Sequence, residues 1–402
     1  MFKSVILFLT LICLPLFSAY HKLPSFHSVE IDSDLEIGYG VVLADMNGDG
    51  LQDIVLADKK QFVWYQNPYW EKHIMVENLT ERDNVSIAAR DLDGDGKAEI
   101  AVGAQWNPGE TSNETMSGSI HYLIPPVDRT QLWTPVKLPH EPTTHRMLWL
   151  ETASGKFNLV VLPLHGRGNK GGVGAGVNII AYRKPEDPRD PWETSLLSDH
   201  LHKTHNLEVT SAIPGSKGKE EVLIAGEEGG YRYSQSGESW LGVQVIGQGE
   251  RSEGFVGAGE VRAGTLPGGE FFITTVEPMH GNQLASYRLP SKDAAQKLGI
   301  RNVIFEDMLE GHAIATGDLL GVGSDQIVAG WRGNRKNPEK IGIKLFIPQD
   351  GKGDEWTSVD VDSAGMACED LKLGDLNGDG KLDIVACGRG TQNLRIYFNT
   401  TP

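Results

Sequence analysis

Three short acidic segments share one pattern, in which oxygen-bearing side chains alternate with other residues and glycine stands at the fourth and sixth positions. They read DMNGDGLQD (45–53), DLDGDGKAE (91–99) and DLNGDGKLD (375–383). A fourth segment, DLLGVGSDQ (318–326), keeps both glycines but loses most of the oxygen ligands. Each segment is preceded and followed by a short apolar run, such as VVLAD and DIVLAD around the first. The pattern predicts a repeated pair of strands joined by a tight turn, for which glycine is the suitable residue.

The three complete segments, called the acidic loops below, have the ligands that a hard cation prefers. Side-chain oxygens at alternating positions and a backbone carbonyl at the seventh can surround Ca²⁺ with six to eight oxygens. An EF-hand opens similarly, but it needs a glutamate at the twelfth position and helical flanks, whereas these flanks are strand-like. We expect structural calcium bound by Asp45, Asn47, Asp49, Leu51 and Asp53, by Asp91, Asp93, Asp95, Lys97 and Glu99, and by Asp375, Asn377, Asp379, Lys381 and Asp383.

The rest of the chain follows the same period. Strand-like runs that match the first strand of the pair end near positions 45, 91, 152, 212, 264, 318 and 375, which gives seven units. In the first unit, four runs rich in β-branched and aromatic residues are separated by turn residues. Four strands in each of seven radially repeated units is the design of a seven-bladed β-propeller.

The last unit contains only three strands before the chain ends, while the segment SFHSVEID (25–32) precedes the first unit and resembles an outer strand. We expect this N-terminal strand to complete the last blade, which removes two exposed sheet edges. Residues 20–402 are therefore predicted to form a single all-β propeller domain.

Residues 1–19 contain one lysine and then an apolar run that ends in small residues. This is the layout of a signal peptide, cleaved after Ala19, and it predicts a secreted or periplasmic protein. The alternative is a membrane anchor, but the run is shorter than the roughly 20 residues that span a bilayer. No other segment is apolar enough, so we expect no membrane span.

The formal net charge is −17. Because nucleic-acid binding requires clustered lysine and arginine, this charge argues against a nucleic-acid partner. Nothing in the sequence indicates a particular oligomeric state. Cys368 and Cys387 flank the last acidic loop, and they could form a disulfide or remain buried free thiols.

Propeller topology places the acidic loops on one side of the disc, and it places the starts of first strands and the ends of second strands on the other. Five histidines from four consecutive units fall at these latter positions: His145, His165, His205, His280 and His312. A single strand-end histidine is usually structural, but five on one face favour a shared centre. Histidine serves as an acid or base near neutral pH and binds divalent metals.

Other side chains with chemical potential also end second strands on this histidine face. Arg332 and Arg389 could stabilise negative charge in a transition state. Trp331 and Trp106 could stack on a sugar ring. We expect Gln105, Trp106, Glu227 and Trp331 to bind substrate there.

The acidic loops between paired strands resemble FG-GAP (VCBS-type) repeats, and this resemblance spans nearly the whole chain. More particular phrases, among them THRMLWLE, LVVLPLHGRGN, HKTHNLEV and VEPMHGNQLASY, resemble the propeller domain of the fungal aldos-2-ulose dehydratase family and its bacterial relatives. That resemblance implies elimination of water from oxidised sugars such as 1,5-anhydrofructose and glucosone in the central cleft of the propeller.

The predicted function is therefore that of a secreted carbohydrate-active lyase or dehydratase with a carbohydrate substrate. His145, His165 and His205 are the expected proton-transfer groups, and His280 and His312 are further acid/base candidates or ligands of a divalent metal. Arg332, Arg389 or such a metal would stabilise the enolate. A lyase that acts on an acidic glycan uses the same proton abstraction. The competing hypothesis is a non-catalytic propeller that binds glycans or mediates adhesion.

Overall fold

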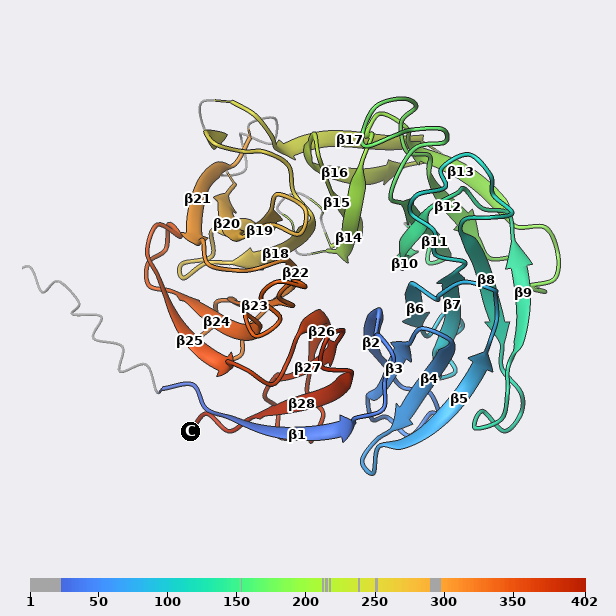
Figure 1. Ribbon diagram of the computed structural model, residues 1–402, viewed down its shortest axis with the longest axis horizontal. Helices are drawn as coiled ribbons and strands as arrows, with labels where there is room; N and C mark the ends of the chain where they lie inside the picture. Colours follow the sequence, from blue (N-terminus) through green and yellow to red (C-terminus); the bar gives the residue numbers. More distant parts are fainter. Residues whose placement is uncertain are drawn as a thin grey trace, which may run out of the picture.

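The computed structural model of the protein describes residues 23–402, except for 153, 212, 214, 215, 217, 238, 250, 251 and 290–297. The described residues form twenty-eight strands, arranged as seven four-stranded antiparallel sheets around a common axis (Figure 1). They contain no α-helix, and none of them forms a helix long and apolar enough to cross a membrane. The predicted signal peptide lies outside the described residues.

The seven sheets are the blades, numbered here in chain order. The innermost strands of blades 1 to 7 are β2 (Gly40–Ala44), β6 (Ser86–Arg90), β10 (Thr144–Glu151), β14 (Thr204–Thr210), β18 (Glu260–Thr265), β22 (Gly311–Gly317) and β26 (Cys368–Gly374). The second strands are β3 (Asp53–Ala57), β7 (Glu99–Ala104), β11 (Phe157–Pro163), β15 (Glu221–Gly226), β19 (Phe271–Glu277), β23 (Gln326–Trp331) and β27 (Asp383–Gly388). All seven predicted first-strand ends fall within two residues of the observed ones.

Each blade continues outward with a third and a fourth strand. The third strands are β4 (Gln61–Gln66), β8 (Ser119–Ile124), β12 (Ile179–Arg183), β16 (Gly229–Ser236), β20 (Gln283–Arg288), β24 (Gly342–Pro348) and β28 (Asn393–Asn399). The outer strands of blades 1 to 6 are β5 (Glu71–Glu77), β9 (Thr134–Leu138), β13 (Glu193–Ser198), β17 (Ser239–Ile246), β21 (Ile300–Phe305) and β25 (Trp356–Asp362).

The N-terminal strand β1 (Phe26–Asp32) is the outer strand of blade 7. It pairs antiparallel with β28, so that Phe26 lies opposite Asn399 (Figure 1). The predicted closure of the last blade by the N-terminal strand is therefore confirmed. The ladder hydrogen bonds of β1 satisfy an edge that would otherwise be exposed.

The hydrophobic core is divided among the blade interfaces. Seven clusters of buried apolar residues occur, and each joins residues of two neighbouring blades; Phe62 and Ile100, for example, pack between blades 1 and 2. Both faces of each sheet are thus covered, which explains why second strands such as β3 are buried along their whole length.

The acidic loops have the conformation that their glycines imply. Gly48 and Gly50 have φ of 83° and 82°, and the equivalent glycines at 94, 96, 378 and 380 are also in the positive region. The first aspartate of each loop accepts a backbone N–H from the sixth residue, as in the 2.7 Å bond from Gly50 to Asp45. The degenerate loop of blade 6 is similar, with Gly323 donating to Asp318 at 2.7 Å.

Neighbouring loops are linked to one another across the blade interfaces. The Asn67 side-chain amide donates to the carbonyl of Leu376, 2.9 Å away in blade 7, and Asn399 donates to Leu319 of blade 6 at 2.7 Å. The backbone N–H of Ala98 donates to the carbonyl of Asp45 at 2.8 Å. The loops of blades 6, 7, 1 and 2 therefore form one connected strip on this side of the disc.

Cys368 and Cys387 are buried free thiols in the structure, so the disulfide alternative is not the one observed. Cys368 lies opposite Gly388 in the β26–β27 ladder, and Cys387 lies opposite Asp370. The two cysteines are thus not cross-strand partners. The Cys387 thiol contacts the carbonyl of Gly38 at 3.1 Å, which shows its role in packing between blades 7 and 1.

Candidate functional site: a histidine cluster on the propeller axis

Three histidines occupy the same position in three blades. His145, His205 and His312 are the second residues of the innermost strands β10, β14 and β22. In each strand the pairing register with the second strand shifts at this point, between Thr144 and Arg146 in β10 for example. Such a bulge re-aims a side chain, and here the ring of His205 contacts those of both His145 and His312, with centroids 4.7 and 5.1 Å apart.

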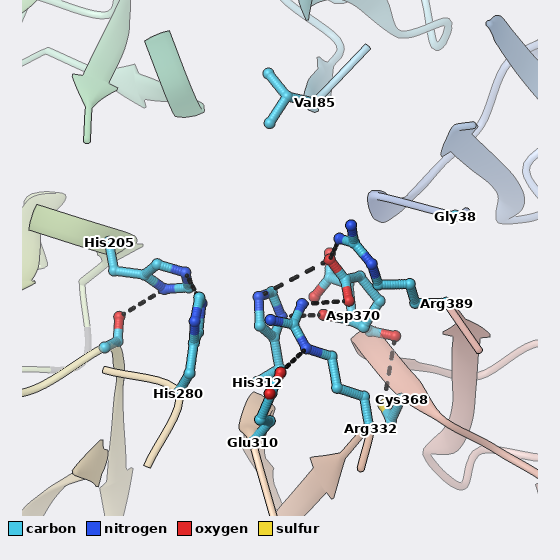
Figure 2. Close-up of polar contacts among 12 residues, drawn as sticks. Gly38, Val85, His205, His280, Glu310, His312, Arg332, Cys368, Asp370 and Arg389 are labelled. Atoms are coloured by element: carbon cyan, nitrogen blue, oxygen red, sulfur yellow. Dashed lines mark hydrogen bonds and ion pairs between the residues drawn. The ribbon is translucent and has the colours of Figure 1, made fainter. Parts of the chain in front are cut away.

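His280 reaches the same group from a different element. It follows β19 of blade 5 and has a φ of 57°, a strained conformation for a residue with a side chain. Its Nε2 lies 2.8 Å from Nε2 of His205, and its ring centroid lies 4.8 Å from that of His312 (Figure 2). His145 is adjacent, with its centroid 4.7 Å from that of His205. Four of the five predicted histidines therefore converge, and we call them the histidine cluster.

Hydrogen bonds fix the tautomers of the cluster. Nδ1 of His145 lies 2.8 Å from the carbonyl of His205, and Nδ1 of His312 lies 2.6 Å from the carbonyl of Glu369. Nδ1 of His205 faces the carbonyl of Gly259 and the carboxylate of Glu260, at 3.2 and 3.0 Å. Because a carbonyl oxygen only accepts, each Nδ1 must donate a proton. In the neutral rings Nε2 then carries the lone pair, which in His205 faces Nε2 of His280 at 2.8 Å.

Burial keeps these rings neutral. It lowers the pKa of His145, His205 and His312 far below the usual value, and it also lowers the pKa of His280. Burial raises the pKa of Glu260 to about 7. Unprotonated nitrogens are what both a general base and a metal ligand require.

The histidine positions suit a divalent metal. Ligand atoms of His205, His280 and His312 lie within 4.8 Å of one another. The Nδ1 hydrogen bonds of His205 and His312 are the kind of outer contacts that orient metal-binding imidazoles. The donor set is nitrogen-only and neutral, which suits zinc and related transition metals better than calcium.

Two glutamates complete the cluster, and the sequence-based prediction missed both. Glu260 begins β18, where its second oxygen accepts a 2.5 Å hydrogen bond from Asn206. Glu369 is the second residue of β26, at the same bulged position as the three histidines. Its Oε1 lies 3.9 Å from Nε2 of His312. Alignment of the first residues of the seven innermost strands would have revealed Glu369 as the counterpart of a histidine.

Glu369 also holds the two predicted arginines. Arg332 donates to it at 2.6 Å and Arg389 at 3.1 Å, so both guanidinium groups lie beside the histidine cluster (Figure 2). The Arg332 side chain is only 12% exposed, whereas that of Arg389 is 43% exposed. Arg389 is therefore the more accessible of the two to a ligand.

The remaining predicted residues divide into one that reaches the cluster and four that do not. The Trp106 ring stacks on His145 with centroids 4.8 Å apart. His165 is half-buried beside Lys203 and contacts none of the four clustered histidines in the described part of the chain. Glu227 is exposed next to the glycine-rich segment at Gly172.

Gln105 and Trp331 have structural contacts instead of a place in the cluster. Gln105 has a φ of 56°, and its side-chain carbonyl accepts the backbone N–H of Arg82. Trp331 is 8% exposed and packs against Phe305 in the core between blades 5 and 6. The prediction that Trp331 stacks on a sugar does not agree with this placement, because the side chain of the last β23 residue turns into the sheet interface.

Comparison with protein families bears directly on this face. Residues 117–289 match the β-propeller domain of aldos-2-ulose dehydratase, a range that contains His145, His205 and His280. Residues 45–102 match an FG-GAP-like repeat, and residues 84–123 match an FG-GAP repeat. The chain is a β-propeller with FG-GAP repeats in residues 45–123, and residues 117–289 resemble the propeller domain of aldos-2-ulose dehydratase.

A characterised relative gives the same resemblance at low identity. Aldos-2-ulose dehydratase from Phanerodontia chrysosporium is 22% identical over 270 residues, which is 63% of this chain and 28% of the relative. The alignment thus spans little more than a quarter of that protein.

Solved structures share the fold. A chain of the mitotic checkpoint complex superposes with a TM-score of 0.57 at 12% identity, covering 99% of this chain and 98% of the other. The BBS1N chain from a complex with ARL6DN gives 0.55 at 13% identity, with 95% and 99% covered. At such identities the likeness concerns only the propeller architecture.

Proposed function

We propose that this FG-GAP-repeat propeller is a carbohydrate-active carbon–oxygen lyase that eliminates water, or a glycosidic leaving group, from an oxidised sugar. The observation that supports it most strongly is the convergence of four neutral histidines on the axis. The resemblance to aldos-2-ulose dehydratase supports the same class of reaction. The proposed location is secreted or periplasmic, by way of the predicted N-terminal signal peptide.

The elimination needs a base for a proton next to a carbonyl and an acid for the departing oxygen. The α C–H bond breaks, its electron pair forms the new double bond, the β C–O bond breaks, and the leaving oxygen takes up a proton. His145 suits the proton transfers, because its Nδ1 is fixed by the His205 carbonyl and its Nε2 has a free lone pair. Stacking on Trp106 holds the ring in place.

We assign His205, His280 and His312 to a divalent transition metal, which would supply Lewis-acid polarisation of the substrate carbonyl. Around it, Glu260 and the carbonyl of Glu369 fix the orientation of two of the imidazoles. Arg389 is placed to stabilise negative charge on an enolate oxygen, because it is accessible and anchored by Glu369.

The acidic loops are proposed to hold calcium, separately from this centre. Oxygens of Asp91, Asp93 and Glu99 lie within 4.8 Å of one another, and these are hard ligands of the type that calcium prefers. The loops lie at the opposite ends of the innermost strands from the histidine cluster. Their proposed role is to stabilise the blades.

The deciding experiment follows ultraviolet absorbance while the protein is incubated with 1,5-anhydrofructose, glucosone and uronate glycans, with and without Zn²⁺. The expected result is an enone or unsaturated-uronate band that requires the metal and disappears in His145→Gln. If no substrate gives a band while the protein binds sugars on a glycan array, the non-catalytic glycan-binding function suggested by the FG-GAP repeats replaces this proposal.

A further inference from the structure

A pocket of about 540 Å³ opens on the histidine face between blades 6 and 7. Its walls come from the segment that follows β23 and from the turn between β27 and β28. This volume falls within the range of small-molecule sites in proteins. Arg332, Arg335 and Arg389 line the pocket, and the single acidic lining residue is Glu310.

The arginines give this pocket a positive charge in a protein whose formal net charge is −17. Arg332 is held on both sides, by Glu310 at 3.1 Å and by Glu369 at 2.6 Å. Arg389 makes one hydrogen bond to Glu369 and lies over the Tyr39 ring. Arg335 is exposed and forms no ion pair with any described residue. Arg389 and Arg335 therefore keep donors available for a ligand.

The pocket is separated from the histidine cluster by one side chain. Glu369 contacts both arginines with its carboxylate, and the same carboxylate lies 3.9 Å from Nε2 of His312. In the wall, Glu310 has a φ of 55°, and the backbone N–H of Gly333 donates to the carbonyl of Leu309 at 2.9 Å. A ligand that fills the pocket would thus lie one side chain away from the cluster.

We propose that this pocket binds the carboxylate of a uronate unit, so that the sugar presented to the histidine cluster is acidic. Guanidinium groups match a carboxylate in shape and charge, with two parallel N–H donors for its two oxygens. The inference rests on the proposed function for the identity of the ligand as a sugar. It goes beyond that function by naming the charge of the substrate.

The test compares binding of methyl β-D-glucuronide, methyl β-D-glucoside and glucose 6-sulfate by isothermal titration calorimetry, with the full calcium-saturated chain. The glucuronide and the glucoside differ only in the group on C5. We expect the glucuronide to bind at least tenfold more tightly than the glucoside and the sulfate. In Arg335→Ala that preference should fall at least fivefold, because one of the free guanidinium groups is lost.

Lys336→Ala is the matched control, since Lys336 is an adjacent exposed cation that does not line the pocket. It should leave the preference unchanged, and a thermal melt of each variant establishes that it is folded. Equal binding of glucuronide and glucoside, tighter binding of the sulfate, or an unchanged preference in Arg335→Ala would overturn the proposal. Because no turnover is measured, such a failure leaves elimination from a neutral keto-sugar standing, whereas the absorbance assay tests that reaction by itself.

Discussion

All of the blades have four strands, but blades 1 and 2 differ from blades 3, 4 and 6 at both ends of the innermost strand. In blades 1 and 2 the strands β2 and β6 pair without interruption, and they lead into complete acidic loops. In blades 3, 4 and 6 the strands β10, β14 and β22 contain a bulge with a histidine, and no complete acidic loop follows. Blade 7 has both features, with Glu369 at its bulge and a complete loop.

The two ends of an innermost strand therefore vary independently. The strand between them is held by core packing at two blade interfaces, so a change at one end need not disturb the other. We therefore infer that the acidic loops stabilise the folded state and that the side chains at the bulged positions carry out the chemistry.

The largest effect is expected from the bulged position of blade 3. His145→Gln should lower the rate of elimination by about 10²- to 10⁴-fold, the usual contribution of a positioned acid or base. The glutamine amide can still donate to the His205 carbonyl, so the fold and the metal content should be retained. Steady-state kinetics and elemental analysis of the purified variant check this prediction.

His202→Gln is the control for that measurement. His202 lies on the same face but pairs with Glu228 at 2.7 Å, outside the cluster. Its turnover should stay within twofold of the wild type. An equal loss of rate in both variants would show that histidines on this face matter for structure and not for catalysis.

Removal of calcium should produce the next largest effect. At calcium concentrations about 100-fold above Kd, each occupied loop adds about 2.7 kcal/mol to the free energy of unfolding. EDTA, or Asp49→Ala in one loop, should therefore lower the unfolding temperature by several degrees, as measured by calorimetry. Asp318→Ala in the degenerate loop should leave the calcium dependence as it is. If a variant that lacks all three acidic loops responded to calcium as strongly as the wild type does, the assignment of calcium to these loops would be contradicted.

The stabilisation by calcium should also depend on pH. Burial raises the pKa of Glu99 to about 7 and that of Asp53 to about 6. In the unfolded state the pKa of a carboxyl group is about 4. Between pH 4.5 and 7 the calcium-free folded state therefore binds more protons than the unfolded state does. Stability without calcium should fall as the pH rises through this window.

Calcium requires the ionised carboxylates, so the difference in unfolding temperature with and without calcium should grow from pH 5 to pH 7.5. Thermal melts in paired buffers measure it. A difference that is constant across this range would mean that Glu99 and Asp53 are not ligands.

The smallest effect is expected at Trp331. Trp331→Phe removes part of a buried ring from the interface of blades 5 and 6 and should cost about 1 kcal/mol of stability. KM should change less than twofold, since the ring does not reach the histidine cluster. A large rise in KM with unchanged stability would restore Trp331 as a substrate-binding residue.

The sequence predicted the fold well because the evidence for it is local and repeated. Each acidic loop marks the junction of two strands, and the strand-like segment at 25–32 identifies the partner of β28. The common face of His145, His205, His280 and His312 follows from topology alone. These features depend on position along a strand, which the repeat period specifies.

The placements that the sequence did not specify depend on where a side chain turns. No single stretch of sequence marks the bulge at Glu369, and this residue stands out only when the innermost strands of several blades are aligned. Trp331 ends β23 and its ring turns into the sheet interface, whereas His165 lies two residues beyond the end of β11, beside Lys203. Rotation of a side chain about its strand is decided by packing between blades, which the sequence of one blade does not specify.

A paired measurement distinguishes the residues that stabilise the fold from those that carry out the chemistry. Unfolding temperature and turnover are determined for Asp379→Ala, in the acidic loop of blade 7, and for His280→Gln. Our account predicts that Asp379→Ala unfolds several degrees lower with its rate per folded molecule within twofold of the wild type. It predicts that His280→Gln loses at least 99% of its turnover and unfolds close to the wild-type temperature. The reverse pattern, or equal losses of both quantities in both variants, would contradict it.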